Sequence, residues 1–205
     1  MILSDKPEKI LYGDGYITDS LGALSFRISA KSFYQVNSVQ AERLYRIAMK
    51  MARLTGFDEV LDAYCGTGTI ALTAAKWGAG HVTGIELNPS AVSDAVENAK
   101  QNNISNADFV CSDASVYFKQ LAREGRRADV VFLDPPRSGS DERFLASLIK
   151  LKPKTVIYIS CNPETLERDL RYLTSMGPYT VRGIQPVDMF PHTPHVETVA
   201  LLSKT

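Results

Sequence analysis

Residues 60–71 read Val60-Leu61-Asp62-Ala63-Tyr64-Cys65-Gly66-Thr67-Gly68-Thr69-Ile70-Ala71. The first residues of this stretch are apolar enough for a buried strand, Gly66 and Gly68 interrupt the strand, and the residues from Thr69 onward favour a helix. A strand, a glycine turn and a helix in this order are typical of the nucleotide-binding corner of an open α/β sheet. The glycines permit positive φ angles and let a ligand approach the backbone closely.

The segment His81-Val82-Thr83-Gly84-Ile85-Glu86 predicts the next strand, and it ends in an acid. The acid follows the glycine turn by about 20 residues, the spacing at which a carboxylate accepts hydrogen bonds from ribose hydroxyls in dinucleotide-binding folds. Gly66, Gly68 and Ala71 also fit the pattern G-x-G-x-x-G/A of those folds. The pattern alone leaves open a nicotinamide cofactor, an adenosine-containing methyl donor, or a glycine turn that binds nothing.

The composition suits one α/β domain with a small appendage, because the chain has 205 residues of which 44% are hydrophobic. Lys and Arg number 23, as do Asp and Glu, so the formal net charge is zero. A neutral chain argues against strong unaided binding to a phosphate backbone, although a separate module could still hold a nucleic acid. Cys65, Cys111 and Cys161 lie far apart, and we find no signal-peptide pattern and no apolar run of membrane length. We therefore expect no metal site, no membrane association and a reduced, cytoplasmic protein.

Residues 1–30 differ from the rest of the chain. We predict a hairpin in which 10–12 pairs with 16–18 around the turn Gly13-Asp14-Gly15, followed by a further strand at Leu24–Ile28. So few strands cannot form a core alone. We interpret residues 1–30 as the remnant or edge of a neighbouring domain and residues 31–205 as the main domain.

From residue 38 onward the chain alternates between helical and strand patterns. A helix with Asn37 or Ser38 as its N-cap is predicted over Ser38–Leu54. The later helices are predicted at 69–77, 89–101, 114–123, 141–150 and 163–175, and the strands at 60–64, 81–86, 107–111, 128–134, 155–160, 179–187 and 195–202. This alternation predicts a mostly parallel seven-stranded sheet with helices on both faces. The last two strands have no helix between them, so we expect them to pair antiparallel.

Polar or reactive side chains follow the predicted strands at their carboxyl ends, where ligands bind in open parallel sheets. In chain order these are Tyr64, Glu86, Asp113, Asp134 and Cys161. We expect them to converge on one edge of the sheet.

Two of these positions have both a functional and a plain structural interpretation. The prolines of Asp134-Pro135-Pro136-Arg137 fix the backbone and so hold Asp134 at the sheet edge, or they only end the strand. Cys161 precedes a predicted helix whose amino end favours a thiolate, but a lone cysteine is often inert and buried. By the second reasoning Cys65 and Cys111 are structural residues.

Further candidates lie near the two ends of the main domain. Glu197 begins the last strand; in a cleft it would serve as a general base, and at a sheet edge it would be solvated. His192 and His195 have no evident third partner for a metal. Gln35, before the first long helix, either hydrogen-bonds the edge of a ligand or is an ordinary loop residue.

Taken together, these motifs resemble the RNA uracil-5-methyltransferase family, which methylates uridine in ribosomal or transfer RNA using S-adenosylmethionine. The resemblance covers roughly residues 24–205 and rests on the ordered set Phe33-Tyr34-Gln35-Val36-Asn37, Asp62-Ala63-Tyr64-Cys65-Gly66-Thr67-Gly68, Asp134-Pro135-Pro136-Arg137, Ser160-Cys161-Asn162-Pro163 and 188–197.

The resemblance implies a Rossmann-like class I S-adenosylmethionine-dependent methyltransferase that acts on carbon 5 of uridine. It implies that Cys161 is the nucleophile and Glu197 the base. The implied cofactor-binding residues are Gln35, Tyr64, Gly66, Thr69, Glu86, Asp113 and Asp134. It implies an RNA substrate, ribosomal (23S) rather than transfer RNA, and no DNA.

One departure from the family is large. Its members usually carry an amino-terminal RNA-binding barrel and a fuller central domain, and some hold a cysteine-bound iron–sulfur cluster. This chain has neither the length nor the cysteines for them, so it resembles the catalytic portion of a longer enzyme; a naturally short member is the other interpretation. We expect the chain alone to bind the donor and to methylate natural RNA poorly.

Three alternatives make different predictions. A nicotinamide-dependent oxidoreductase would use the glycine turn and Glu86 but leaves Cys161 and Glu197 without roles. A methyltransferase for another position of an RNA base, such as an exocyclic amine, often has an aromatic residue after its Pro-Pro, where this chain has Arg137. A non-catalytic RNA-binding or assembly protein would bind the donor without transferring a methyl group.

Overall fold

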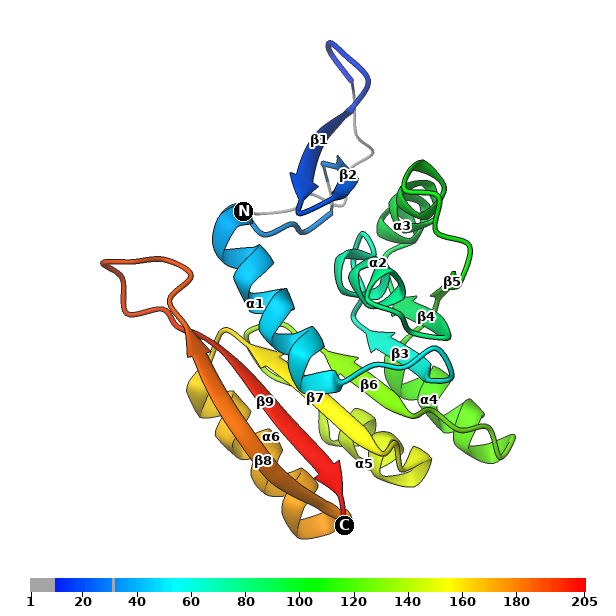
Figure 1. Ribbon diagram of the computed structural model, residues 1–205, viewed down its shortest axis with the longest axis vertical. Coiled ribbons are helices and arrows are strands. Elements are labelled where there is room, and N and C mark those ends of the chain that lie inside the picture. Colours follow the sequence, from blue (N-terminus) through cyan, green and yellow to red (C-terminus); the bar gives the residue numbers. More distant parts are fainter. Residues whose placement is uncertain (1–9, 31) are drawn as a thin grey trace.

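The computed structural model describes residues 10–30 and 32–205. At its centre is a seven-stranded sheet of order β5-β4-β3-β6-β7-β9-β8 (Figure 1). The strands are β3 (Glu59–Ala63), β4 (His81–Glu86), β5 (Ala107–Cys111), β6 (Val130–Leu133), β7 (Thr155–Ser160), β8 (Tyr179–Val187) and β9 (Glu197–Lys204). The pairs from β5 to β7 are parallel, and β9 is antiparallel to both β7 and β8. The predicted mostly parallel sheet with an antiparallel last pair is confirmed.

Helices cover both faces of the sheet (Figure 1). They are α1 (Ser38–Ala52), α2 (Thr69–Lys76), α3 (Pro89–Gln101), α4 (Ala114–Arg123), α5 (Glu142–Leu151) and α6 (Pro163–Met176). Apolar residues of α1, α2 and α3 form one core cluster with one sheet face, and those of α4, α5 and α6 form a second cluster with the other. Among the described residues, no helix combines the length and the hydropathy needed to cross a membrane.

Backbone chemistry at the ends of the elements explains most boundaries. Asn88 and Asn162 cap helices whose first residue is a proline, and both α3 and α6 begin where the sequence predicts. Helix α1 ends at Ala52 rather than Leu54, because Arg53 adopts a left-handed φ of 51°. Strand β9 begins at Glu197 rather than His195.

The amino-terminal strands form a separate two-stranded sheet of β1 (Tyr16–Leu21) and β2 (Leu24–Ser29). Its turn contains Gly22, which has a φ of 56°. The hairpin predicted around Gly13-Asp14-Gly15 is therefore wrong, since residues 10–15 form no strand. A strand there would have no apolar face to bury: Ile10, Leu11 and Tyr12 are 61%, 86% and 98% exposed. In β2 the alternate residues Leu24, Phe26 and Ile28 are buried.

The free edge of β2 pairs with side chains of α3 rather than with another strand. Three side chains one helical turn apart accept hydrogen bonds from alternate backbone N–H groups of β2: Asn102 from Ser25 (2.9 Å), Asn98 from Arg27 (2.6 Å) and Asp94 from Ser29 (2.8 Å). The amide groups of Asn102 and Asn98 also donate to the carbonyls of Ser25 and Arg27. These side chains satisfy an edge that would otherwise be unpaired.

Candidate active site

The glycine turn after β3 leaves open space beside its backbone. Gly66 and Gly68 have φ angles of 54° and 85°. A Cβ at Gly66 would meet no atom within 4 Å, whereas one at Gly68 would lie 3.0 Å from the ring of Phe109. Gly68 is therefore required because it packs closely against Phe109 of β5 and has a positive φ angle. At Gly66 the space beside the backbone is open, so a ligand can approach the main chain there.

Glu86, at the end of β4, is tied to this turn. One carboxylate oxygen accepts from the N–H of Gly66 at 3.1 Å, and the other accepts from the N–H of Asn88 at 2.8 Å. Each oxygen keeps capacity for a second hydrogen bond. The structure thus places Glu86 directly beside the glycine turn, as the sequence spacing predicted.

Asn98 is a residue of this region that the sequence analysis missed. It is fully buried, and besides its bonds to β2 it donates to the carbonyl oxygen of Thr67 at 3.0 Å. One side chain therefore joins the amino-terminal sheet to the middle of the glycine turn. Nothing in the local sequence indicates this contact, because Asn98 lies within an ordinary helical pattern.

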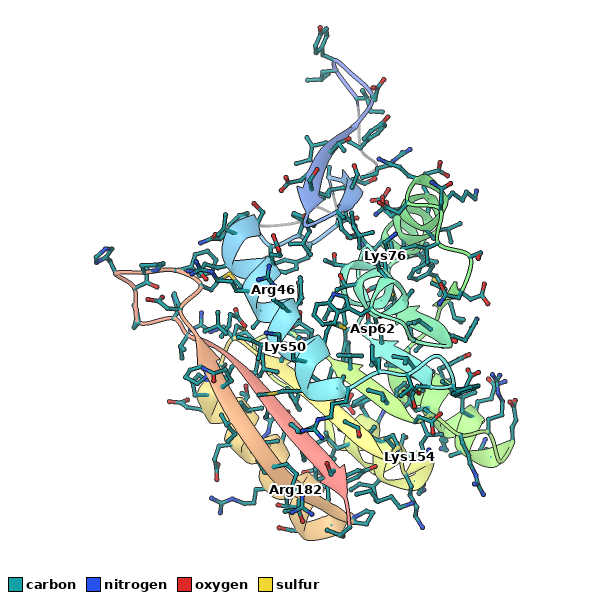
Figure 2. All side chains as sticks on the ribbon, viewed as in Figure 1. Arg46, Lys50, Asp62, Lys76, Lys154 and Arg182 are labelled. Atoms are coloured by element: carbon teal, nitrogen blue, oxygen red, sulfur yellow. The ribbon has the colours of Figure 1, made fainter. Side chains whose placement is uncertain are left out.

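A second missed residue is Asp62, which is fully buried inside β3 (Figure 2). Neither of its carboxylate oxygens has a hydrogen-bond partner among the described residues. Burial raises the pKa of this carboxyl well above its usual value, and the charge of Asp134 adds to the increase. The signal in the sequence was an acid within an apolar strand.

Asp134, Cys161 and Glu197 come together at the carboxyl edge of the sheet. Asp134 and Cys161 directly follow the parallel neighbours β6 and β7, and Glu197 begins the antiparallel β9, where Ser160 lies opposite Thr198. Burial and the charge of Glu197 raise the pKa of Asp134 to about 7, and burial raises the pKa of Glu197. The structure therefore brings a thiol and two carboxyls into one electrostatic neighbourhood.

The charge around Cys161 differs from the sequence expectation. Burial raises the pKa of the Cys161 thiol, and the charges of Glu197 and Asp134 raise it further, against smaller lowering effects from its own backbone and from Arg137. Burial and the two carboxyl groups therefore oppose the thiolate that the amino end of α6 favours.

The pH dependence of Cys161 alkylation should show the raised pKa of its thiol directly. Half-maximal alkylation of Cys161 should occur at a pH above about 8.5, the ordinary thiol value. Glu197→Gln should lower that midpoint because it removes the charge that raises the pKa of Cys161 most, while Glu164→Gln, on the exposed first turn of α6, should leave it unchanged. Since Cys111 is also exposed, the rate is read by mass spectrometry on the peptide that carries Cys161. A midpoint below the ordinary value would mean that the helix end dominates after all.

The other cysteines differ from each other. Cys65 is buried, and burial followed by the charges of Asp62 and Glu86 raises its pKa. Cys111 is exposed and donates weakly to the carbonyl of Leu87 at 3.6 Å, so its assignment as a buried structural residue is wrong.

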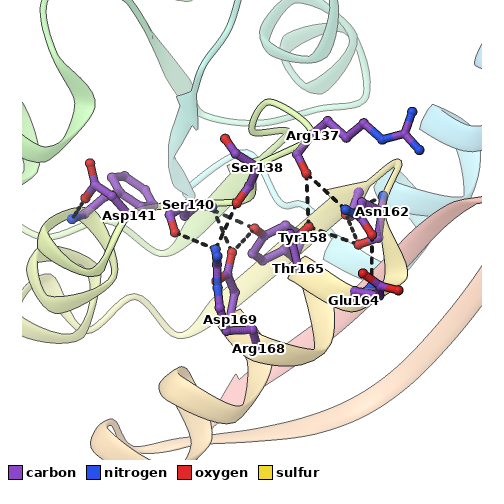
Figure 3. A network of polar contacts seen from close by, with 12 residues as sticks. Arg137, Ser138, Ser140, Asp141, Tyr158, Asn162, Glu164, Thr165, Arg168 and Asp169 are labelled. Carbon is purple, nitrogen blue, oxygen red and sulfur yellow. Dashed lines mark hydrogen bonds and ion pairs between the residues drawn. The ribbon is translucent and has the colours of Figure 1, made fainter.

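A buried polar network fixes the loop after β6 (Figure 3). Asp169 of α6 is fully buried and accepts hydrogen bonds from the N–H of Ser140 at 2.8 Å and from the hydroxyl of Tyr158 at 2.6 Å. Arg168 pairs with Asp169 at 2.7 Å and donates to the carbonyls of Ser138 and Ser140. This network positions the loop that carries Asp134 against the helix that follows Cys161.

The loops after β6 and β7 are also joined directly. The side chains of Asn162 and Thr165 both donate to the carbonyl of Arg137, at 3.3 and 3.4 Å, while the Arg137 side chain extends away from the network (Figure 3). Asp134 and Cys161 therefore sit on two loops that share hydrogen bonds.

The remaining candidates lie around this centre. Gln35 is buried just before α1, and the phenol of the nearby Tyr34 has no hydrogen-bond partner in the described part of the chain. Burial raises the pKa of Tyr45 of α1, and the charges of Asp134, Asp62 and Glu197 raise it further. The inner side of α1 thus forms one wall of the site.

Two candidates face the other layer of helices. Tyr64 has a φ of 68°, and its ring packs on Phe144 of α5 with centroids 5.4 Å apart. Asp113 caps α4 by accepting from the N–H of Val116 at 3.0 Å. The structure therefore does not bring Asp113 into contact with Cys161.

Thr69 begins α2, with its hydroxyl 3.4 Å from that of Thr67.

Comparison with known proteins agrees with this arrangement. The tRNA (Uracil-5-)-methyltransferase family profile matches residues 1–205. An uncharacterized RNA methyltransferase of Halalkalibacterium halodurans is 49% identical over 202 residues, which are 98% of this chain and 43% of that protein. One of Bacillus cereus is 48% identical over 204 residues, covering 100% of this chain and 44% of that protein. The chain thus spans less than half the length of these relatives.

Solved structures have the same fold. The Pyrococcus abyssi tRNA (uracil-54, C5)-methyltransferase in complex with S-adenosyl-L-homocysteine matches with a TM-score of 0.76 and 37% identity, over 93% of this chain and 45% of that one. A SAM-dependent methyltransferase from Agrobacterium tumefaciens matches with a TM-score of 0.71 and 16% identity over 95% of this chain and 72% of that one, which shows the fold alone. The predicted Rossmann-like methyltransferase fold and the family resemblance are confirmed: the chain belongs to the tRNA (uracil-5-)-methyltransferase family.

Proposed function

We propose that this chain is the catalytic portion of an S-adenosylmethionine-dependent enzyme that methylates carbon 5 of a uridine in RNA. The observation that carries the proposal is the meeting of Cys161, Glu197 and Asp134 at the sheet edge on which the glycine turn and Glu86 also lie. The identity of 37% to the Pyrococcus abyssi enzyme over most of this chain supports it. In this proposal residues 31–205 form the catalytic domain and residues 1–30 belong to an adjoining one.

The site has the features that an adenosine-containing methyl donor needs. Open space beside Gly66 gives access to main chain, and Glu86 holds two acceptor oxygens beside the turn. We assign Glu86 to the ribose hydroxyls, with the other donor-binding residues being Gln35, Tyr64, Gly66, Thr69, Asp113 and Asp134. When bound, S-adenosylmethionine would supply an electrophilic methyl group on a sulfonium.

The proposed roles of Cys161 and Glu197 follow from the chemistry of uracil, whose carbon 5 is a poor nucleophile. The Cys161 sulfur, as a thiolate, adds to carbon 6, and the displaced electron pair makes carbon 5 an enolate carbon able to take a methyl group. Glu197 then takes the proton from carbon 5, the carbon–sulfur bond breaks and the thiolate leaves. The raised pKa of Glu197 makes its carboxylate a stronger base for this step.

Removing the Glu86 carboxylate should weaken donor binding. Glu86→Ala is expected to cost about 1.5–3 kcal/mol in donor affinity, the range for a hydrogen bond that involves a charged group. Isothermal titration calorimetry measures it, and Glu97→Ala on the exposed side of α3 is the control. An unchanged affinity would remove Glu86 from the donor site.

Variants at two asparagines of α3 should distinguish the binding of β2 to α3 from the contact that supports the glycine turn. Both Asn98→Ala and Asn102→Ala remove hydrogen bonds to β2, but only Asn98 contacts Thr67. Both variants should unfold at lower urea concentration. Only Asn98→Ala should also lower donor affinity, by about 2- to 10-fold if one hydrogen bond of 0.5–1.5 kcal/mol is lost from the turn. Equal donor affinities would show that the Thr67 contact has no effect on the site.

The proposed function is tested by transfer of labelled methyl from the donor to unmodified transfer and ribosomal RNA, followed by nucleoside analysis. The expected product is 5-methyluridine. The family resemblance implied ribosomal RNA, whereas the Pyrococcus abyssi neighbour is a tRNA (uracil-54, C5)-methyltransferase, so both RNAs are offered. Methylation of another base position, tight binding of NAD in place of the donor, or donor binding without transfer to any RNA would each reject the proposal.

A further inference from the structure

Helix α1 carries a row of cations on one side. Arg43, Arg46 and Lys50 follow one another at intervals of three or four residues, so they lie on the same side of the helix, and Arg53 caps its carboxyl end. All four side chains are exposed, whereas Leu44, Tyr45 and Ala48 of the same helix are buried. Figure 2 shows Arg46 and Lys50 on the outer side of α1. We call these four residues the α1 row.

The row leads into a groove of about 660 Å³ at the amino-terminal edge of the sheet. The groove is lined by Lys50 and Arg53 and also by Lys154, just before β7, and Arg182, within β8, both labelled in Figure 2. Lys154 pairs with Asp129 at 2.7 Å. Asp58 and Asp129 also line the groove, so its four cations exceed its two acids. Lys50, Arg53 and Arg182 form no ion pair with any residue that the structure describes.

Helix α1 connects this groove to the reacting edge of the sheet. At its amino end Asn37 donates to the carbonyl of Met189 at 2.9 Å, in the loop before Glu197. Its carboxyl end lies in the groove. The 15 residues of α1 span about 22 Å at 1.5 Å per residue. The four exposed cations therefore lie along the helix between the reacting edge and the groove, and one of them, Arg46, is paired with Glu42 of the same helix.

Helix stability does not explain the whole row. Cations in the last turn interact favourably with the helix dipole, which accounts for Lys50 and Arg53. Arg43 and Arg46 lie nearer the amino end, and Arg182 belongs to another element. The zero net charge of the chain therefore does not describe this part of the surface, where these cations gather.

We propose that the α1 row and Arg182 bind phosphates of the RNA strand that flanks the target uridine, away from the reacting edge. This inference rests on the proposed function, because it needs an RNA substrate. Contacts of this kind are independent of sequence and add to the length of RNA that the chain can hold.

The test uses a triple variant, Lys50→Gln with Arg53→Gln and Arg182→Gln, and a fluorescent uridine-containing RNA hairpin at several low salt concentrations. Each lost phosphate contact should reduce the slope of log K against log salt by about 0.7–0.9, so we expect a total reduction of about 2. The matched control is Lys119→Gln, because Lys119 is exposed on α4, on the opposite face of the sheet. Donor affinity should stay the same in all variants.

Methyl transfer separates this inference from the proposed function. The triple variant should raise KM for the hairpin and leave kcat unchanged, and a uridine trinucleotide, too short to reach the groove, should be methylated equally by all variants. If wild type methylates the hairpin but the triple variant matches Lys119→Gln in slope and KM, the inference is wrong and the function stands. A wild-type hairpin affinity that does not depend on salt also overturns the inference. If wild type methylates neither RNA, the proposed function itself fails.

Discussion

Cys161→Ala is expected to abolish methylation of RNA and to leave no covalent complex between protein and RNA. Carbon 5 cannot accept a methyl group until sulfur has added to carbon 6, so nothing downstream of that addition proceeds. The rate should fall on the order of 10⁴-fold or more, the scale seen when an enzyme loses its nucleophile. Single-turnover assays with labelled donor on a uridine hairpin measure this.

Two controls accompany Cys161→Ala: its affinity for the methyl donor and the turnover of Cys111→Ala. Donor affinity should survive in Cys161→Ala, because none of the contacts of Glu86 with the glycine turn involves Cys161. Cys111→Ala removes an exposed thiol at the end of β5 and should retain normal turnover. Normal turnover by Cys161→Ala would refute the assignment of the nucleophile.

Glu197→Gln is expected to stop the reaction at a later point. Sulfur addition and methylation do not need the Glu197 carboxylate, but removal of the carbon-5 proton does. Turnover should therefore fall by about 10²–10⁴-fold, the usual contribution of a general base, while a protein–RNA complex accumulates. Denaturing gels detect the complex, which should be absent from the double variant with Cys161→Ala.

Asp134→Asn gives a comparison for Glu197→Gln, because both changes remove a negative charge that acts on Cys161. Only the loss of Glu197 should trap the complex. If Glu197→Gln turned over normally without a complex, another group or a water molecule would be the base.

The fold could be predicted from the sequence because local signals and global architecture agree. Strands β4, β5, β7 and β8 have the predicted bounds, and β7 shows the clearest reason, because its buried apolar run ends at Ser160 just before the cap of α6. The error at residues 10–18 has a physical cause. The tight glycine turn there is a hairpin signal, but hairpin formation also requires an apolar face to bury, and only β2 supplies one.

The candidate site was predictable where it depends on strand ends and not where it depends on contacts between distant elements. The positions of Glu86, Asp134 and Cys161 follow from the carboxyl ends of the predicted parallel strands, whereas the role of Glu197 was implied only by the family resemblance. The bond from Asn98 to Thr67 joins residues 31 positions apart, and the Asp169 network joins α6 to a loop 29 positions earlier. No periodicity marks such pairs.

Electrostatics could not be inferred from sequence neighbours either. Cys161 is next to a helix start in the chain, which favours a thiolate, yet Glu197 reaches it from β9 and Asp134 from β6. The charges that raise its pKa become visible only when the strands are placed side by side. The α1 row is another example, because the net charge of the chain is zero although these cations gather along one helix.

The central claim is that Cys161 attacks uracil, and trapping with a fluorinated substrate tests it most directly. The chain is incubated with the methyl donor and a hairpin that has 5-fluorouridine at the target position, since Glu197 cannot remove fluorine as it removes a proton. Mass spectrometry of the digested complex should find methylated fluorouridine bound to the peptide that contains Cys161. An adduct on the peptide of Cys65 or Cys111, or no adduct under conditions in which the same chain methylates the unfluorinated hairpin, would contradict the account.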